Sequence, residues 1–178
     1  FNKDSIKQEP VDIKDSNWHI SISPNGKYIV TFNHENMQFN IVEYDQYNTI
    51  NKQNSCTINE DFKEYKFKEK LYSKWMLAIS NMDQNIILVA ISYITEFDML
   101  VSKEVKDDKQ PLNGKTIIYK IKYPFKQDDN IIIIKNEYIS IFNKGGIVSF
   151  IYNSDEIQKV DCLIFNAEGI YKLTYIIN

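Results

Sequence analysis

One pattern of alternating side chains occurs twice in this chain, at residues 18–30 and again at residues 75–87. Each copy opens on tryptophan, carries an apolar alternation that ends in Ile-Ser, and passes through a four-residue turn into a second apolar run. Alternation with a period of two predicts a β-strand with one buried face. Two such strands joined by a turn predict an antiparallel hairpin, so the repeat favours a fold assembled from copies of one hairpin.

The first copy shows the pattern most clearly. Trp18, Ile20 and Ile22 alternate with small or polar residues, so we expect the tryptophan side of this strand to be buried. Residues 28–32 and 38–44 follow as two further expected strands, rich in β-branched and aromatic residues. Three consecutive antiparallel strands form a meander.

The turn of the first copy is Pro24-Asn25-Gly26-Lys27. Proline presets φ for a turn, and Asn-Gly tolerates positive φ at low cost. Pro24, Asn25 and Gly26 are therefore expected to anchor the hairpin.

Two fainter copies follow, at residues 138–151 around Gly145-Gly146 and at residues 162–173. The other segments are expected strands at residues 64–68, 116–121 and 131–134, and expected loops at residues 48–59 and 101–114. A helix over residues 61–74 is the alternative to the first of these strands. The four isoleucines of residues 131–134 lack alternation, which suits a strand covered on both faces.

Residues 22–29, with the sequence Ile-Ser-Pro-Asn-Gly-Lys-Tyr-Ile, resemble the "SPDGKYI" hairpin between the first two strands of a blade in WD40-like β-propellers, with Asn25 where aspartate is usual. The likeness is close over about thirteen residues and weaker at residues 75–87. The chain departs from the family in lacking Trp-Asp and Gly-His pairs, and its first repeat spacing exceeds the usual blade of roughly 40 to 45 residues.

The resemblance implies an all-β fold: a partial β-propeller of about three to four four-stranded antiparallel blades over residues 18–178. Its repeat hairpins would start near residues 18, 75, 138 and 162, after a tail or edge strand at residues 1–17. Trp18 and Trp75, at matching positions of two copies, would be packing anchors between neighbouring sheets. A two-layer β-sandwich is the alternative architecture.

Composition limits the kinds of partner. The chain has 178 residues, 43% of them hydrophobic, and 21 Lys+Arg against 24 Asp+Glu give a formal charge of −3. All 21 basic residues are lysine, so arginine clamps on phosphate are excluded. We therefore expect no nucleic-acid partner, and the lack of an apolar run near 20 residues predicts no membrane insertion of this segment.

No constellation of reactive residues emerges. His19 and His34 are the only imidazoles and are expected to be surface or hydrogen-bonded residues. Cys56 and Cys162 lie far apart and are expected to be idle thiols. Ser23, Ser80 and Ser149 lack a nucleophile motif, and the acidic pairs 107–108 and 128–129 lack calcium-loop spacing. The sequence therefore predicts no catalytic, cofactor-binding or metal-binding residue.

These observations favour a non-catalytic protein-interaction scaffold, with proteins as partners and no cofactor, as a piece of a larger protein. The absence of Asn-x-Ser/Thr sites leans toward the cytoplasm. Two alternatives follow from the resemblance: a cytoplasmic regulatory region of a membrane ion-transport protein, and a propeller-type metal-dependent hydrolase.

Overall fold

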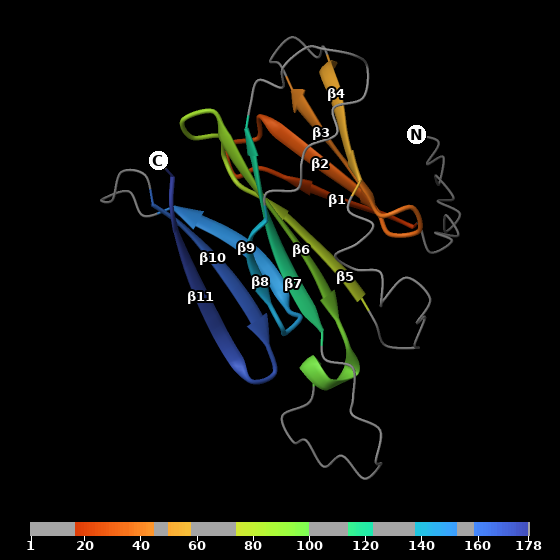
Figure 1. Cartoon of the computed structure of the whole chain (residues 1–178), viewed down its shortest axis with the longest axis vertical. Helices are drawn as coiled ribbons and strands as arrows, with labels where there is room; N and C mark the ends of the chain where they lie inside the picture. The colour runs from red at the N-terminus through yellow and green to blue at the C-terminus, as the bar shows by residue number, and fades with distance from the viewer. Residues whose placement is uncertain are drawn as a thin grey trace, which may run out of the picture.

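The chain is all-β in a computed structural model, which describes residues 17–44, 50–57, 74–99, 114–122, 138–152 and 159–177. These residues form three antiparallel sheets that follow one another across the molecule (Figure 1). Sheet 1 contains β1 (Trp18–Ile22), β2 (Tyr28–Asn33), β3 (Gln38–Tyr44) and β4 (Ile50–Thr57). Sheet 2 contains β5 (Lys74–Ile79), β6 (Ile86–Ile94), β7 (Lys115–Lys122) and β8 (Tyr138–Phe142). Sheet 3 contains β9 (Ile147–Tyr152), β10 (Lys159–Asn166) and β11 (Gly169–Ile176).

Each sheet is a meander, because every strand pairs with the one that precedes or follows it in the chain. A single turn of 3-10 helix, η2 (Glu96–Met99), follows β6. The sheets are joined in a repeated way: β1 lies beside β5, and β5 lies beside β9. The second strand of a sheet also contacts the first strand of the next, as β2 does β5 and β6 does β9. Sheet 1 therefore meets sheet 2 through the same strands as sheet 2 meets sheet 3.

Two hydrophobic cores hold the sheets together, one on each side of sheet 2. The first lies between sheets 1 and 2 and includes Phe32, Phe39 and Tyr119. The second lies between sheets 2 and 3 and includes Phe150 and Cys162. The described residues thus form three stacked layers. This arrangement is compatible both with a partial propeller and with a sandwich of stacked sheets.

β6 is the central strand of this stack, with all nine residues buried. Successive side chains alternate between the two cores: Val89 and Ile91 enter the first, and Leu88 and Ala90 the second. A strand buried on both faces needs continuous apolar character. The sequence suggested such a strand at residues 131–134, which lie outside the described residues.

The apolar side of β1 faces outward, so the prediction that Trp18, Ile20 and Ile22 are buried is wrong. The fractional exposures of these side chains are 46%, 68% and 59%. Alternation fixes which residues share a face, but only the neighbouring layers decide which face is covered. Sheet 2 covers the opposite side of sheet 1, through Val30 and Phe32 of β2.

Both Trp-led hairpins are confirmed as antiparallel pairs, β1 with β2 and β5 with β6. Their turns differ in length, contrary to the gap-free repeat. The amide of Ser23 donates to the Tyr28 carbonyl, whereas the amide of Ser80 donates to the Leu88 carbonyl, three residues later in the repeat. The second turn is therefore longer than four residues, and the likeness of the copies ends at the serine.

The segment at residues 48–59 was expected to be a loop, and that prediction is wrong, since residues 50–57 form β4. β4 pairs with β3 at the edge of sheet 1. An edge strand needs only its backbone to pair, so a polar, asparagine-rich sequence can form one.

The prediction of a hairpin at residues 138–151 is also wrong. β8 pairs with β7 in sheet 2, whereas β9 pairs with β10 in sheet 3, so Gly145-Gly146 lies on the crossing between two sheets. A Cβ on Gly145 would lie 2.2 Å from the Tyr93 carbonyl oxygen and 2.8 Å from the Ile94 Cα. Glycine is required here because two backbones approach closely, which is a tertiary constraint. In the sequence, a glycine placed for this reason looks the same as a glycine in a local turn.

The hairpin at residues 162–173 is confirmed as β10 paired with β11, although these are the second and third strands of their sheet in chain order. The strands expected at residues 38–44 and 116–121 are confirmed as β3 and β7. The expectations for residues 1–16, 61–73 and 101–113 lie outside the described residues.

Candidate interaction surfaces

Turns from neighbouring sheets meet at one end of the stack. The Asn25 amide donates a 2.8 Å hydrogen bond to Oδ1 of Asn81, which joins the first turn to the second. The Asn81 amide in turn donates to the hydroxyl of Tyr152 in β9, and that hydroxyl donates to the Asn81 carbonyl at 3.2 Å. Burial raises the pKa of Tyr152. We call residues 24–27, residues 81–85 and Tyr152 the turn surface.

The side chain of Asn25 organises the first turn. Its Oδ1 accepts hydrogen bonds from the Ser23 hydroxyl at 2.8 Å and from the Lys27 amide at 3.1 Å. An aspartate, usual in the resembled family, would offer the same kind of acceptor. Gly26 has a φ of 72°, where an L side chain is strained. The side chain of Asn25 and the backbone of Gly26 thus fix the turn, and Asn25, Gly26 and Lys27 remain exposed.

The outward side of sheet 1 is a second candidate surface, the front face, formed by Trp18, Ile20, Ile22, Ile29, Thr31 and Val42. Residues directly opposite each other in the register share a face, which places these six together. In the described residues no sheet covers this side of sheet 1. Trp18, Ile20 and Ile22 are exposed, whereas the other three residues are half-buried. Exposed apolar side chains that lie next to one another are typical of interaction sites.

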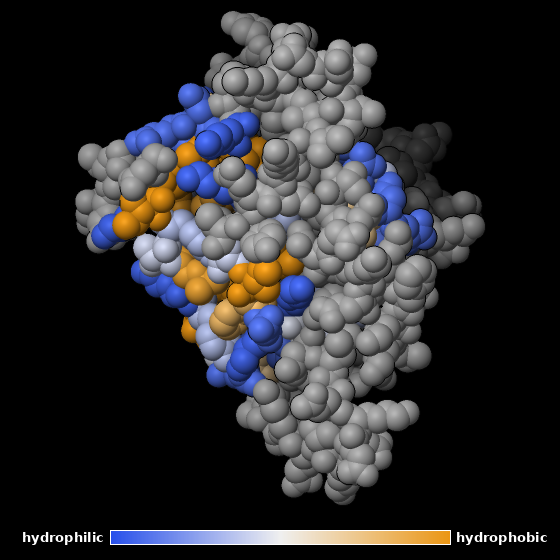
Figure 2. All heavy atoms as spheres, in the orientation of Figure 1, coloured by the Kyte–Doolittle hydropathy of each residue, from blue (hydrophilic) through white to orange (hydrophobic). Residues whose placement is uncertain are grey.

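The outward side of sheet 3 forms a comparable surface, the rear face, made of Ile147, Ile151, Leu163, Phe165, Ile170 and Ile176. Its Ile170 is 66% exposed and its Ile176 is 62% exposed. The face also carries an ion pair in which Lys172 Nζ lies 2.7 Å from Asp161 Oδ2. Hydrogen bonds from Lys172 and Thr174 hold the pKa of Asp161 below its usual value. Apolar residues reach the surface among polar ones on the side of the molecule seen in Figure 2.

The two histidines lie together beside Trp75. His19 Nε2 and His34 Nδ1 are 3.2 Å apart, so one ring donates an N–H to the other. The His34 ring is nearly parallel to the Trp75 ring at a centroid distance of 6.2 Å. Burial, and secondarily the charge of His34, lower the pKa of His19. Trp75 also contacts Phe32 and Tyr93, so it packs between sheets 1 and 2 as expected.

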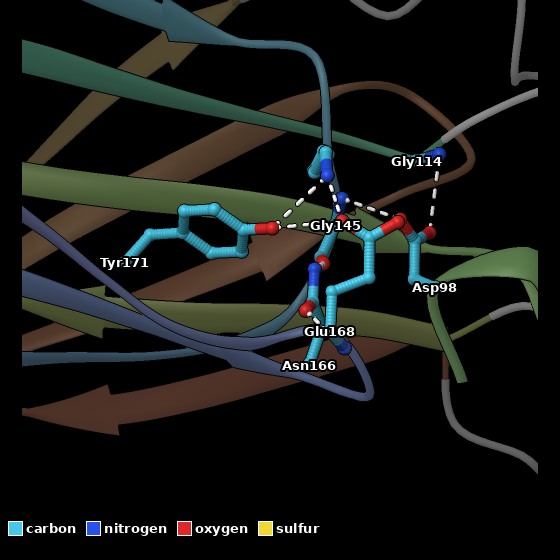
Figure 3. A network of polar contacts seen from close by, with 7 residues as sticks. Asp98, Gly114, Gly145, Asn166, Glu168 and Tyr171 are labelled. Carbon is cyan, nitrogen blue, oxygen red and sulfur yellow. Dashed lines mark hydrogen bonds and ion pairs between the residues drawn. The ribbon is translucent and has the colours of Figure 1, made fainter. Parts of the chain in front are cut away.

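A buried carboxylate, not singled out from the sequence, fastens the crossing between sheets 2 and 3 (Figure 3). Asp98 accepts hydrogen bonds from the Thr95 amide and hydroxyl, the Gly114 amide and the Gly145 amide, at 2.8–3.1 Å. These four donors satisfy the charge locally. Thr95 and Asp98 have the spacing of a capping box, the one signal in the sequence that could have revealed it.

A second set of polar contacts continues from this crossing toward the turn between β10 and β11 (Figure 3). Lys144 Nζ pairs with Glu168 and donates to the Tyr171 hydroxyl at 2.9 Å. The Tyr171 hydroxyl donates to Glu168 Oε2 at 2.7 Å, and Asn166 Nδ2 donates to the Gly145 carbonyl at 3.1 Å. These groups are engaged with one another, so they position the turn.

The other residues considered from the sequence do not converge. Cys162 is buried in the second core, and burial raises the pKa of its thiol to about 12, which keeps it protonated. Ser149 is exposed on β9, and the acidic pairs at residues 107–108 and 128–129 lie outside the described residues. Within the described ranges, no three His, Cys, Asp or Glu residues gather as a set that could hold a metal ion.

No protein-family model, curated protein or solved structure matches this chain. In the part of the chain that the structure describes, no helix has the length and apolar character that crossing a membrane requires.

Proposed function

We propose that the chain is a non-catalytic protein-interaction scaffold and that its three sheets are successive blades of a WD40-like, propeller-type stack. The observation that best supports this proposal is the repeated relation between sheets: β1 lies beside β5 as β5 lies beside β9. Repetition of one sheet-to-sheet relation is the construction principle of a propeller, in which blades are arranged around a common axis.

The turn surface is the part of this scaffold that binds the partner protein. It combines residues from all three sheets on a base held by two well-packed cores, so its shape is preorganised. Polar groups at the opposite end, such as Asp98 and Lys144, are engaged in holding the turns. Because the polar groups at that end hold the fold together, the arrangement favours partner binding at the turn surface over catalysis.

Changing the charges of the turn surface tests the proposal. Lys27 and Gln84 are exposed there, so Lys27→Glu combined with Gln84→Lys changes the surface without disturbing a core. Capture from a lysate of the source cells, followed by mass spectrometry, identifies the candidate partner. Calorimetry with that purified protein should then show binding that the double variant weakens by about tenfold or more.

Glu35→Lys is the matched control, since it reverses an exposed charge in the turn between β2 and β3 and should leave binding unchanged. Equal binding by the wild type and the double variant would reject the turn surface as the site. Hydrolytic turnover by the purified chain that a single side-chain substitution abolishes would reject the non-catalytic assignment.

A further inference from the structure

A neighbouring sheet covers one side of the Trp-led hairpin in the second copy, whereas no sheet of the described residues covers the same side in the first copy. In sheet 2, Trp75, Leu77 and Ile79 lie against the core shared with sheet 1. The corresponding residues of sheet 1, fifty-seven positions earlier, are Trp18, Ile20 and Ile22 of the front face. The front face of sheet 1 therefore corresponds to the side of sheet 2 on which sheet 1 packs.

The rear face of sheet 3 corresponds to the side of sheets 1 and 2 that packs on the following sheet. The rear side of sheet 1 packs on sheet 2, and the rear side of sheet 2 packs on sheet 3. The rear side of sheet 3 carries Ile147, Ile151, Ile170 and Ile176, all more than 40% exposed. The stack of described sheets therefore carries, on its first and last sheets, the two sides of the sheet-to-sheet contact that occurs twice within it.

The charges of the two faces are compatible with their meeting. The described front-face positions on β1, β2 and β3 are apolar or uncharged polar residues. On the rear face, Lys172 pairs with Asp161, and Lys159, which lies opposite Ile176 on the same side of the sheet, also helps to lower the pKa of Asp161. Contact between the faces would therefore bury an ion pair whose charges compensate each other, with Lys159 at the end of its strand, and burying a compensated pair costs less than burying a lone charge.

We propose that the front face binds the rear face of a second copy of this chain, head to tail, so that two copies close a ring of six sheets. This inference rests on the propeller-type arrangement proposed above. Two copies of the three sheets formed by the described residues give six, and propellers close with about four to eight blades. A head-to-tail contact generates a closed ring when its rotation closes, and both contacts of such a dimer are then the same.

Sedimentation velocity of the purified chain over a range of concentrations tests the proposal. The wild type should sediment as a dimer. Ile20→Lys on the front face and Ile170→Lys on the rear face each place a charge in both contacts, so each should weaken dimerisation by about tenfold or more. Ile22→Lys and Ile176→Lys are second variants for the same faces, and far-UV circular dichroism verifies that each variant is folded.

Mixing the two variants gives the sharpest result. Ile20→Lys retains an intact rear face and Ile170→Lys an intact front face, so an equimolar mixture should form a heterodimer through one unmodified contact. Ile141→Lys is the matched control, because Ile141 is exposed on β8 and belongs to neither face. It should dimerise like the wild type.

Three results would overturn the proposal: a monomer at all concentrations, a dimer that only front-face variants weaken, and assemblies that grow without limit. The first would leave the front face for another occupant, such as a further sheet of a longer protein. The turn-surface variant Lys27→Glu/Gln84→Lys should retain dimerisation. Loss of partner binding with dimerisation intact, or the reverse, separates the failure of one proposal from that of the other.

Discussion

The half-buried ring of His19 faces a second imidazole and shows how a single residue responds to its surroundings in this fold. Burial removes water that would stabilise the imidazolium, and His34 adds repulsion when it is charged. Both effects lower the pKa of His19 from its usual value of 6.5. Between the folded pKa and 6.5 the unfolded chain binds more protons, so in this window stability rises with pH.

The resulting prediction concerns the melting temperature. The contribution of neutral His19 is complete above pH 6.5 and is lost as the pH falls through the folded pKa. The melting temperature of the wild type should therefore fall between about pH 7.5 and 5, and that of His19→Gln should fall less. Circular dichroism melts at several pH values measure both.

Asp161 does not obscure this comparison. Its pKa is lowered from 3.8, so its contribution is present above that value and is lost only at more acidic pH, as the pH falls through its folded pKa. Equal falls for the wild type and His19→Gln would contradict the assignment of the effect to His19.

At the scale of an element, the two Trp-led hairpins are closed by a buried serine. The Ser23 hydroxyl accepts from the Tyr28 amide at 2.9 Å, and the Ser80 hydroxyl accepts from the Leu88 amide at 2.8 Å. Each serine also donates its own amide to the same partner's carbonyl. The hydroxyl thereby completes a backbone-like pair and lets turns of different length end identical strands.

Ser80→Ala should consequently destabilise the protein. The substitution leaves the buried Leu88 amide without its acceptor, which costs about 1–3 kcal/mol of unfolding free energy. Urea denaturation followed by circular dichroism measures the change.

Ser149→Ala is the matched control, since Ser149 is an exposed strand serine, and it should change stability by less than about 0.5 kcal/mol. A similar effect of both substitutions would show that the loss at Ser80 reflects strand propensity and not the buried hydrogen bond.

At the scale of the whole molecule, β6 couples the two cores, because its adjacent side chains enter opposite ones. Sheets 1 and 3 are both packed against sheet 2, and the loss of β6 would expose both cores together. We therefore expect the three sheets to unfold in one cooperative transition.

A variant with Trp18→Phe and Cys56→Ser lets two probes report on the two cores. The fluorescence of Trp75 follows the first core, and the reactivity of the Cys162 thiol, which requires exposure, follows the second. Their urea midpoints should coincide. Adding Leu88→Ala, a substitution in the second core, should lower both midpoints together by an amount equivalent to about 2–5 kcal/mol.

The control is Ile141→Ala on β8, which is exposed and belongs to neither the front face nor the rear face, and this substitution should lower the midpoints far less. Separate midpoints for the two probes, or a shift of the Cys162 midpoint alone, would show that sheet 3 unfolds independently of sheets 1 and 2.

Local pattern predicted the strands well where it carried a strong signal. The alternation and turn residues of residues 18–44 predicted β1, β2 and β3 with bounds close to those observed. The polar sequence of β4 gave no sign of a strand, because the pairing of an edge strand depends on its backbone and not on its side chains. For the candidate surfaces, Asn25 and Gly26 were found from turn chemistry, whereas Tyr152 and Asn81 meet only through tertiary packing.

The sequence by itself determined which side chains share a face of each strand, because alternation with a period of two is a local property of an extended backbone. It could not determine which faces are covered, because that depends on which sheet lies beside which. The tertiary structure placed Trp75 inside and Trp18 outside although both occupy the same position of one repeated hairpin. Sheet 1 covers the face of sheet 2 that carries Trp75, whereas no described sheet covers the face of sheet 1 that carries Trp18. The burial of each tryptophan therefore depends on which sheet lies next to its face.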